Sequence, residues 1–177
     1  MSRHERGRAY LARLTRLGIL CGVALLALMT CLVVLQVAAR NFFDLGLPWA
    51  DELARFSAIG LVFLGVPCLA GRQVLVAVTM LPDACPPKVR GWMAFACDLA
   101  TLLFAALLLQ SFAEYLPRAG KFLTPAMQLP NWVYYSLALV GHAVLAAVAL
   151  DRVVAALTGR PATAPYHDPR DDTGLPT

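Results

Sequence analysis

The ionisable residues that could carry chemistry are few, and they fall into two settings in a mostly apolar chain. Asp51, Glu52 and Arg55 lie close together at the start of a long apolar run, and they are the densest charged group on the face that we predict to be outside. Asp98 and His142 each stand alone inside such a run. A carboxylate or imidazole within a membrane is costly, so each is a candidate for ion binding, proton transfer or cofactor ligation.

His142 is the histidine that lies within an apolar run, because His4 and His167 stand near the two ends of the chain. A bis-histidine haem needs two axial imidazoles at facing depths, which this chain alone does not supply. We therefore expect no cofactor, no metal and no catalytic residue. We interpret His142 as a packed, hydrogen-bonded residue, and a role as ligand or proton carrier is the alternative.

Asp98 is the single acid deep in an apolar run, and its expected depth is shared by three arginines: Arg16, Arg72 and Arg152. An unpaired carboxylate at this depth would be costly, so we predict a salt bridge between helices, with Arg72 as the partner. The alternative is that Asp98 reaches water. A proton relay is not favoured, since no second buried acid is in line with Asp98.

The group at residues 49–55 has two interpretations that the spacing does not separate. Glu52 and Arg55 are three residues apart on one helix face, where a pair contributes about 0.2–0.5 kcal/mol. Alternatively, Asp51, Glu52 and Arg55 together with Trp49 form a contact surface for another membrane subunit.

Composition places these residues in a membrane protein. Of 177 residues, 59% are hydrophobic and 15% are charged, and the mean hydropathy is +0.66. A soluble domain of this size does not have enough interior to bury that much apolar surface. The net charge of +4 is distributed unevenly, which bears on membrane topology and not on nucleic acid.

The expected fold class is an all-α membrane protein, with a transmembrane domain at residues 17–152. Its four apolar runs, each near the roughly 20 residues that cross a bilayer, are 17–39, 49–72, 93–113 and 132–150. The short apolar stretch 74–81 cannot span and is predicted to lie at the interface between helices two and three. Aromatic residues at helix entries are predicted interface anchors, namely Trp92, Trp132, Tyr134 and Tyr135.

The basic residues predict the orientation. Residues 1–16 are a basic segment, either a short amphipathic helix or a solvated tail, and residues 153–177 are predicted to be a disordered tail. With a cytoplasmic amino terminus, the outside holds only Arg40, Arg55, Arg118 and Lys121. The inside then holds the other arginines and lysines, and this places both termini in the cytoplasm.

Several of these stretches, in this order, resemble the small membrane subunit of tripartite ATP-independent periplasmic (TRAP) transporters. That family ends helix one with arginine and an aromatic residue, as at 40–42, and opens helix two with Trp-x-Glu-Glu-Leu-x-Arg, as at 49–55. The loop 124–130 before Trp132 is also similar. The chain departs from the pattern at Leu75 and Thr79, where relatives often carry histidine and aspartate.

The resemblance implies a non-catalytic scaffold in the bacterial inner membrane. In that family a large membrane subunit carries the sodium and substrate sites, and a soluble periplasmic solute-binding protein delivers a small organic solute. The expected partners are therefore the large subunit, the binding protein in a transient contact, and the phospholipid bilayer. Two alternatives from the residues alone are the anchor subunit of a redox complex and a small self-assembling channel or exporter.

Overall fold

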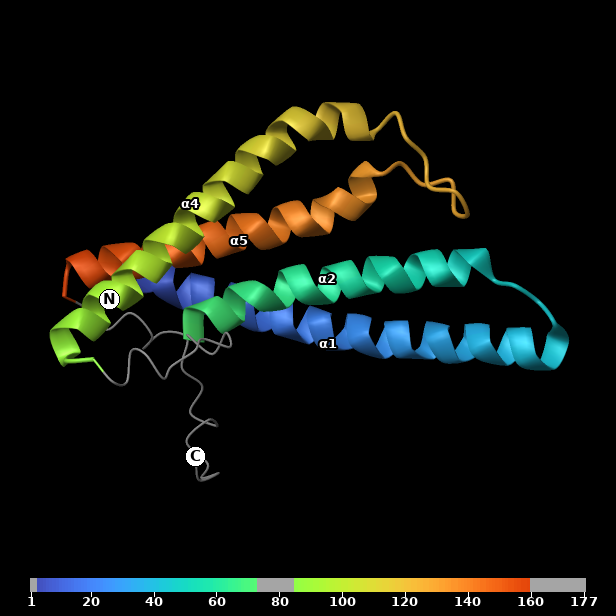
Figure 1. Cartoon of the computed structure of the whole chain (residues 1–177), viewed down its shortest axis with the longest axis horizontal. Coiled ribbons are helices and arrows are strands. Elements are labelled where there is room, and N and C mark those ends of the chain that lie inside the picture. Colours follow the sequence, from blue (N-terminus) through green and yellow to red (C-terminus); the bar gives the residue numbers. More distant parts are fainter. Residues whose placement is uncertain (1–2, 73–84, 160–177) are drawn as a thin grey trace, which may run out of the picture.

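The computed structural model describes residues 3–72 and 85–159, and almost all of these lie in four helices (Figure 1). The helices are α1 (Arg3–Phe43), α2 (Pro48–Arg72), α4 (Pro87–Ala119) and α5 (Trp132–Leu157). The described residues contain no strand, and one isolated bridge joins Leu123 to Pro130. The predicted all-α fold with four long apolar helices is therefore confirmed.

Each of the four helices is long and apolar enough to cross a bilayer. The candidate spans are Arg6–Phe43, Pro48–Gly71, Lys88–Ala119 and Trp132–Leu157. The described basic residues before position 17 belong to the same helix as the apolar run that follows them. This helix, α1, is continuous over 41 residues. At about 1.5 Å per residue such a helix is roughly 60 Å long, about twice the thickness of a bilayer core.

Two of our sequence predictions concern segments that lie partly or wholly outside the described residues. The interfacial stretch 74–81 lies outside the described residues, and so does most of the tail that we predicted from residue 153. Within the described part, α5 continues to Leu157, so the first residues of that predicted tail belong to the helix.

The helices are arranged in the order α1, α2, α5, α4. The helix α2 packs between α1 and α5, whereas α4 packs against α5 and against no other described helix. Figure 1 shows α4 crossing α5 near one end of the molecule and leaning away from it toward the other. We call the first end, where α1 begins and α5 finishes, the basal end, and the opposite end, with the 120–131 connection, the loop end.

Glycines allow two of these helix pairs to approach closely, as small residues do in membrane proteins. A Cβ atom on Gly18 of α1 would lie 2.6 Å from the carbonyl oxygen of Leu64 on α2. A Cβ atom on Gly141 of α5 would lie 2.3 Å from the carbonyl oxygen of Phe63 on α2. Both separations are too short for a real side chain, so α2 is held between its neighbours by backbone contact.

Candidate functional site

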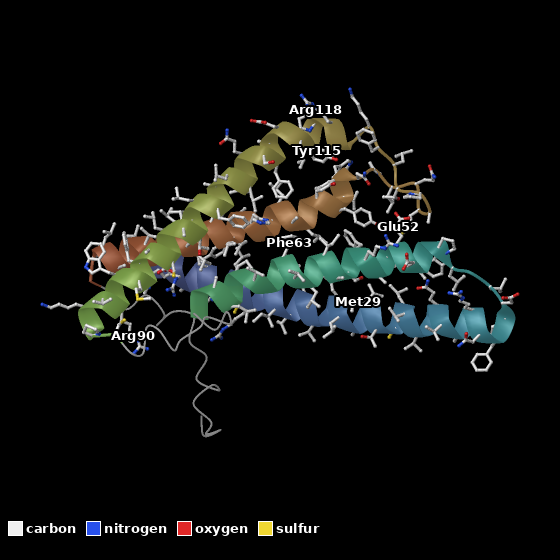
Figure 2. All side chains as sticks on the ribbon, viewed as in Figure 1. Met29, Glu52, Phe63, Arg90, Tyr115 and Arg118 are labelled. Atoms are coloured by element: carbon white, nitrogen blue, oxygen red, sulfur yellow. The ribbon has the colours of Figure 1, made fainter. Side chains whose placement is uncertain are left out.

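The carboxylate of Glu52 attaches α2 to the connection between α4 and α5 at the loop end (Figure 2). Its Oε2 atom accepts the backbone N–H groups of Ala126 at 2.9 Å and Met127 at 3.0 Å. Its Oε1 atom accepts the hydroxyl of Tyr134 at 3.0 Å. These contacts join α2 to residues that are more than seventy positions away in the chain. Glu52 therefore holds two distant segments of the protein together.

The 120–131 connection is also closed on itself. The backbone N–H of Thr124 donates to the carbonyl of Leu129 at 2.8 Å, and the N–H of Leu129 donates to Oγ1 of Thr124 at 3.0 Å. Gln128 has a φ of 54°, which is uncommon for a residue with a Cβ atom and marks a tight turn. The connection therefore presents a defined shape next to Glu52.

The neighbouring charged residues of α2 point elsewhere. Arg55 pairs with Asp51, one turn away, and not with Glu52, so the local pair, one of the two interpretations that the spacing left open, is not formed in the described structure. The reason is that Glu52 is already satisfied by the connection and by Tyr134. Trp49 is 43% exposed, and the side chains of Arg55 and Asp51 are 75% and 45% exposed. We call Trp49, Asp51 and Arg55 the rim.

At the basal end, Arg152 of α5 joins three helices. Its Nε and Nη2 atoms donate to the two carboxylate oxygens of Asp98 on α4, at 2.8 and 2.9 Å. Its Nη1 atom donates to the carbonyl of Gly71 at 3.1 Å, in the last turn of α2. Arg152 is only 2% exposed, and its charge is neutralised within the protein by the carboxylate of Asp98.

The predicted salt bridge of Asp98 with another helix is present, and the partner in the described structure is Arg152. The side chain of Arg72, which we predicted as the partner, lies outside the described residues. Arg152 is able to reach Asp98 because α5 packs directly against α4.

A second ion pair fastens α1 to the same end. Arg8 donates to Asp151 at 3.1 Å, and both side chains are mostly covered. Asp151 precedes Arg152 in the sequence, so two adjacent residues of α5 hold α1 on one side and α4 and α2 on the other. We call these two pairs and the bond to Gly71 the basal ties.

The four predicted interface anchors differ in their surroundings. Trp92 and Trp132 are 73% and 49% exposed, as residues facing head groups would be. Tyr134 packs edge-on against Phe56 at 5.2 Å between ring centroids, and Tyr135 packs against Tyr115 at 5.0 Å. The two tyrosines therefore have partners within the protein, on α2 and α4.

His142 is buried between aromatic rings, as the packed interpretation predicts. Its imidazole lies 5.0 Å from the ring of Phe63 on α2 and 5.7 Å from the ring of Phe112 on α4, between centroids. Its Nδ1 atom is 2.8 Å from the carbonyl oxygen of Ala138, one turn earlier in α5. Beside it is a cavity of about 380 Å³ between α2, α4 and α5, which sequence reasoning did not predict.

The described residues hold no group of three or more histidine, cysteine, aspartate or glutamate side chains placed to bind a metal ion. The polar side chains described above are instead distributed at the two ends and beside one cavity. Comparison of the chain with known proteins identifies a family. The family described as "Tripartite ATP-independent periplasmic transporters, DctQ component" matches residues 29–159, which is well over half of the chain.

The chain belongs to the DctQ family. The resemblance inferred from the sequence is thereby confirmed, and the DctQ chain is a multi-pass membrane component of a transporter. A Haemophilus influenzae protein named "Putative TRAP transporter small permease protein" is 28% identical to it over 142 residues, which cover 80% of this chain and 87% of that protein. The region matched to the DctQ family includes Glu52, Asp98, His142 and Arg152 but not Arg8.

Proposed function

We propose that this chain is the non-catalytic small membrane subunit of a TRAP transporter. It scaffolds the large, sodium-coupled subunit that translocates a small organic solute, and a periplasmic binding protein delivers that solute. The family supports the transporter assignment, and the name of the Haemophilus influenzae relative supports the small subunit.

The observation that carries the scaffold role is how the chain uses its charged and polar groups. Arg152 of α5 and Asp98 of α4 neutralise each other, and Asp151 of α5 does the same with Arg8 of α1. Glu52 fastens α2 to the 120–131 connection. Groups engaged in this way hold helices in fixed positions, as a static frame requires, whereas a substrate site needs polar groups that converge on an open space.

The distribution of basic residues supports a cytoplasmic basal end. Of the arginines and lysines in the described ranges, the basal end carries those of early α1 and early α4 together with Arg72 and Arg152, and the loop end carries Arg40, Arg55, Arg118 and Lys121. The positive-inside rule then places the loop end in the periplasm. In this orientation the rim and the 120–131 connection are available to the binding protein and to the periplasmic edge of the large subunit.

Co-purification tests the proposal. The tagged chain is expressed with the genes that flank its own, extracted in a mild detergent, and its partners are identified and quantified by mass spectrometry. We expect one large, many-helix membrane protein in equal amount. Recovery of the chain only as an oligomer of itself, or with a haem- or flavin-bearing partner, would contradict the scaffold role.

The rim is tested in the same complex. Asp51→Lys changes the charge at the exposed rim without touching the bonds of Glu52 to the connection, and we expect it to weaken solute uptake. Lys88→Asp is the control, because it reverses an exposed charge at the basal end. Equal uptake by the two variants would remove the rim from the proposed contact surface.

A further inference from the structure

The first turns of α1 carry arginines on the side that faces away from the other helices. Arg6, Tyr10 and Arg13 are spaced by four and then three residues, so they lie on one side of the helix, and all three are exposed. Leu17 and Leu20, which are 57% and 64% exposed, continue the same side. We call these five residues the outer stripe.

The opposite side of α1 is occupied by the protein itself. Arg8 is paired with Asp151 of α5, and Arg8 and Leu11 border a cavity of about 460 Å³ that α1 shares with α5. Thr15, further along the same side, is 2% exposed. The ion pair to α5 therefore fixes the rotation of α1 about its axis, and this rotation turns the outer stripe outward.

The positive charges of the outer stripe have no compensation in the described structure. The side chains of Arg6 and Arg13 form no hydrogen bond or ion pair with other described residues. The acids of the basal end whose side chains are described, Asp98 and Asp151, are both paired with other arginines. Residues 1–16 contain five arginines and one acid. Arginine near the amino end of a helix is itself unfavourable, because the helix dipole is positive there.

The depth of the outer stripe places its charged part at a membrane surface. The apolar residues 17–39 of α1 span about 35 Å, enough to cross the roughly 30 Å core of a bilayer. Arg13 is one turn before Leu17, and Arg6 is about 10 Å further out along the helix, about one Debye length at physiological ionic strength. The head groups are therefore the membrane layer nearest to both arginines. Tyr10 lies between them, and tyrosine is common in that layer.

We propose that the outer stripe of α1 binds anionic phospholipids in preference to zwitterionic ones. Arg6 and Arg13 attract the negatively charged head group, and Leu17 and Leu20 contact the acyl chains below it. An acidic segment of another protein would match the arginines, but it would not match the exposed leucines that continue the stripe. The proposal is independent of the partners of the transporter, because it requires only that α1 crosses a bilayer.

Fluorescence quenching by labelled lipids tests the proposal on the full chain. Phenylalanine replaces Trp49, Trp92 and Trp132, and tryptophan replaces Leu17, which leaves one fluorophore on the outer stripe. The chain is reconstituted into vesicles with equal amounts of phosphatidylcholine and phosphatidylglycerol, and only one of the two lipids carries bromine on its acyl chains. The lipid that is enriched around the stripe quenches more strongly. A basic residue near an anionic surface corresponds to about a fivefold effect, so we expect a relative binding constant of about five or more in favour of phosphatidylglycerol.

Charge variants in the same background locate the effect. Arg6→Gln with Arg13→Gln should abolish the preference, whereas Arg6→Lys with Arg13→Lys should keep most of it. Arg118→Gln with Lys121→Gln is the control, because it removes two exposed basic residues from the loop end, and it should leave the preference unchanged. Raising the salt concentration from 0.1 M to 1 M shortens the Debye length from about 10 Å to about 3 Å and should weaken the preference. Circular dichroism checks that each variant retains its helices.

Three results would overturn the proposal. The first is equal quenching by the two lipids when the arginines are present. The second is a preference that survives Arg6→Gln with Arg13→Gln. The third is a preference that is lost equally in the loop-end control, since this would show a response to net charge and not to the outer stripe. Recovery of the large subunit in the co-purification does not depend on any of these results, so this proposal and the proposed function fail separately.

Discussion

Asp98→Ala should lower the free energy of unfolding by about 3–5 kcal/mol, the usual effect of removing one partner from a buried ion pair. The reason is the state of Arg152, which is 2% exposed and donates two of its three bonds to Asp98. Without the carboxylate, the guanidinium stays buried with only the carbonyl of Gly71 as an acceptor. The bond from Arg152 to Gly71 is in the last turn of α2. We therefore expect the loss of the Asp98 carboxylate to weaken the packing of both α4 and α2 against α5.

The double variant Asp98→Leu, Arg152→Met separates the charge from the packing. Replacing a whole buried ion pair by apolar residues is often nearly neutral. Here the carbonyl of Gly71 would lose its donor, which costs about 1–3 kcal/mol. We therefore expect the double variant to be less destabilised than Asp98→Ala by about 2 kcal/mol, although it carries one more substitution.

Unfolding of the purified chain in detergent, followed by tryptophan fluorescence and circular dichroism, measures these differences. Arg55→Gln is the control, because it breaks an ion pair whose side chains are 75% and 45% exposed, and exposed pairs contribute about 1 kcal/mol or less. Two results would contradict the described role of the ion pair between Asp98 and Arg152. One is that Asp98→Ala lowers stability no more than Arg55→Gln, and the other is that the double variant is at least as destabilised as Asp98→Ala.

Two further substitutions test the loop end and the helix packing. Glu52→Ala should speed hydrogen exchange at the amides of residues 126 and 127, which lose their acceptor, whereas Asp51→Asn should not; equal exchange in the two variants would argue against the tie. Gly141→Ala should destabilise the chain by about 1–3 kcal/mol, since the added methyl group meets backbone. Gly65→Ala, where nothing lies within 4 Å, should be neutral or stabilising, and the reverse order of the two glycine variants would refute the packing.

Some features of the chain could be predicted because they depend on local sequence. The four long helices follow from the length and apolar character of the runs, since a helix satisfies its own backbone groups without water. The packed environment of His142 follows from its place in such a run. The order of short motifs at 40–42, 49–55 and 124–130 was enough to indicate the family.

Pairings between helices could not be predicted in this way. Asp98 was expected to pair with an arginine at its depth, and three arginines were candidates, but depth alone does not give the neighbours of a helix. Glu52 and Arg55 have a spacing that permits a pair, yet Glu52 turns to the connection between α4 and α5. A local pair contributes so little that tertiary hydrogen bonds readily replace it.

The sequence by itself determined that this protein consists of apolar helices, that its ionisable groups within them are few, and that it resembles the TRAP small subunit. These properties follow from residue type and spacing along one chain. Only the tertiary structure decided that Arg152 is the partner of Asp98, that Glu52 holds the 120–131 connection, and that a cavity lies beside His142. Each of these depends on which helix lies next to which and on the rotation of each helix about its axis, and apolar helices in a membrane leave both to packing between distant residues.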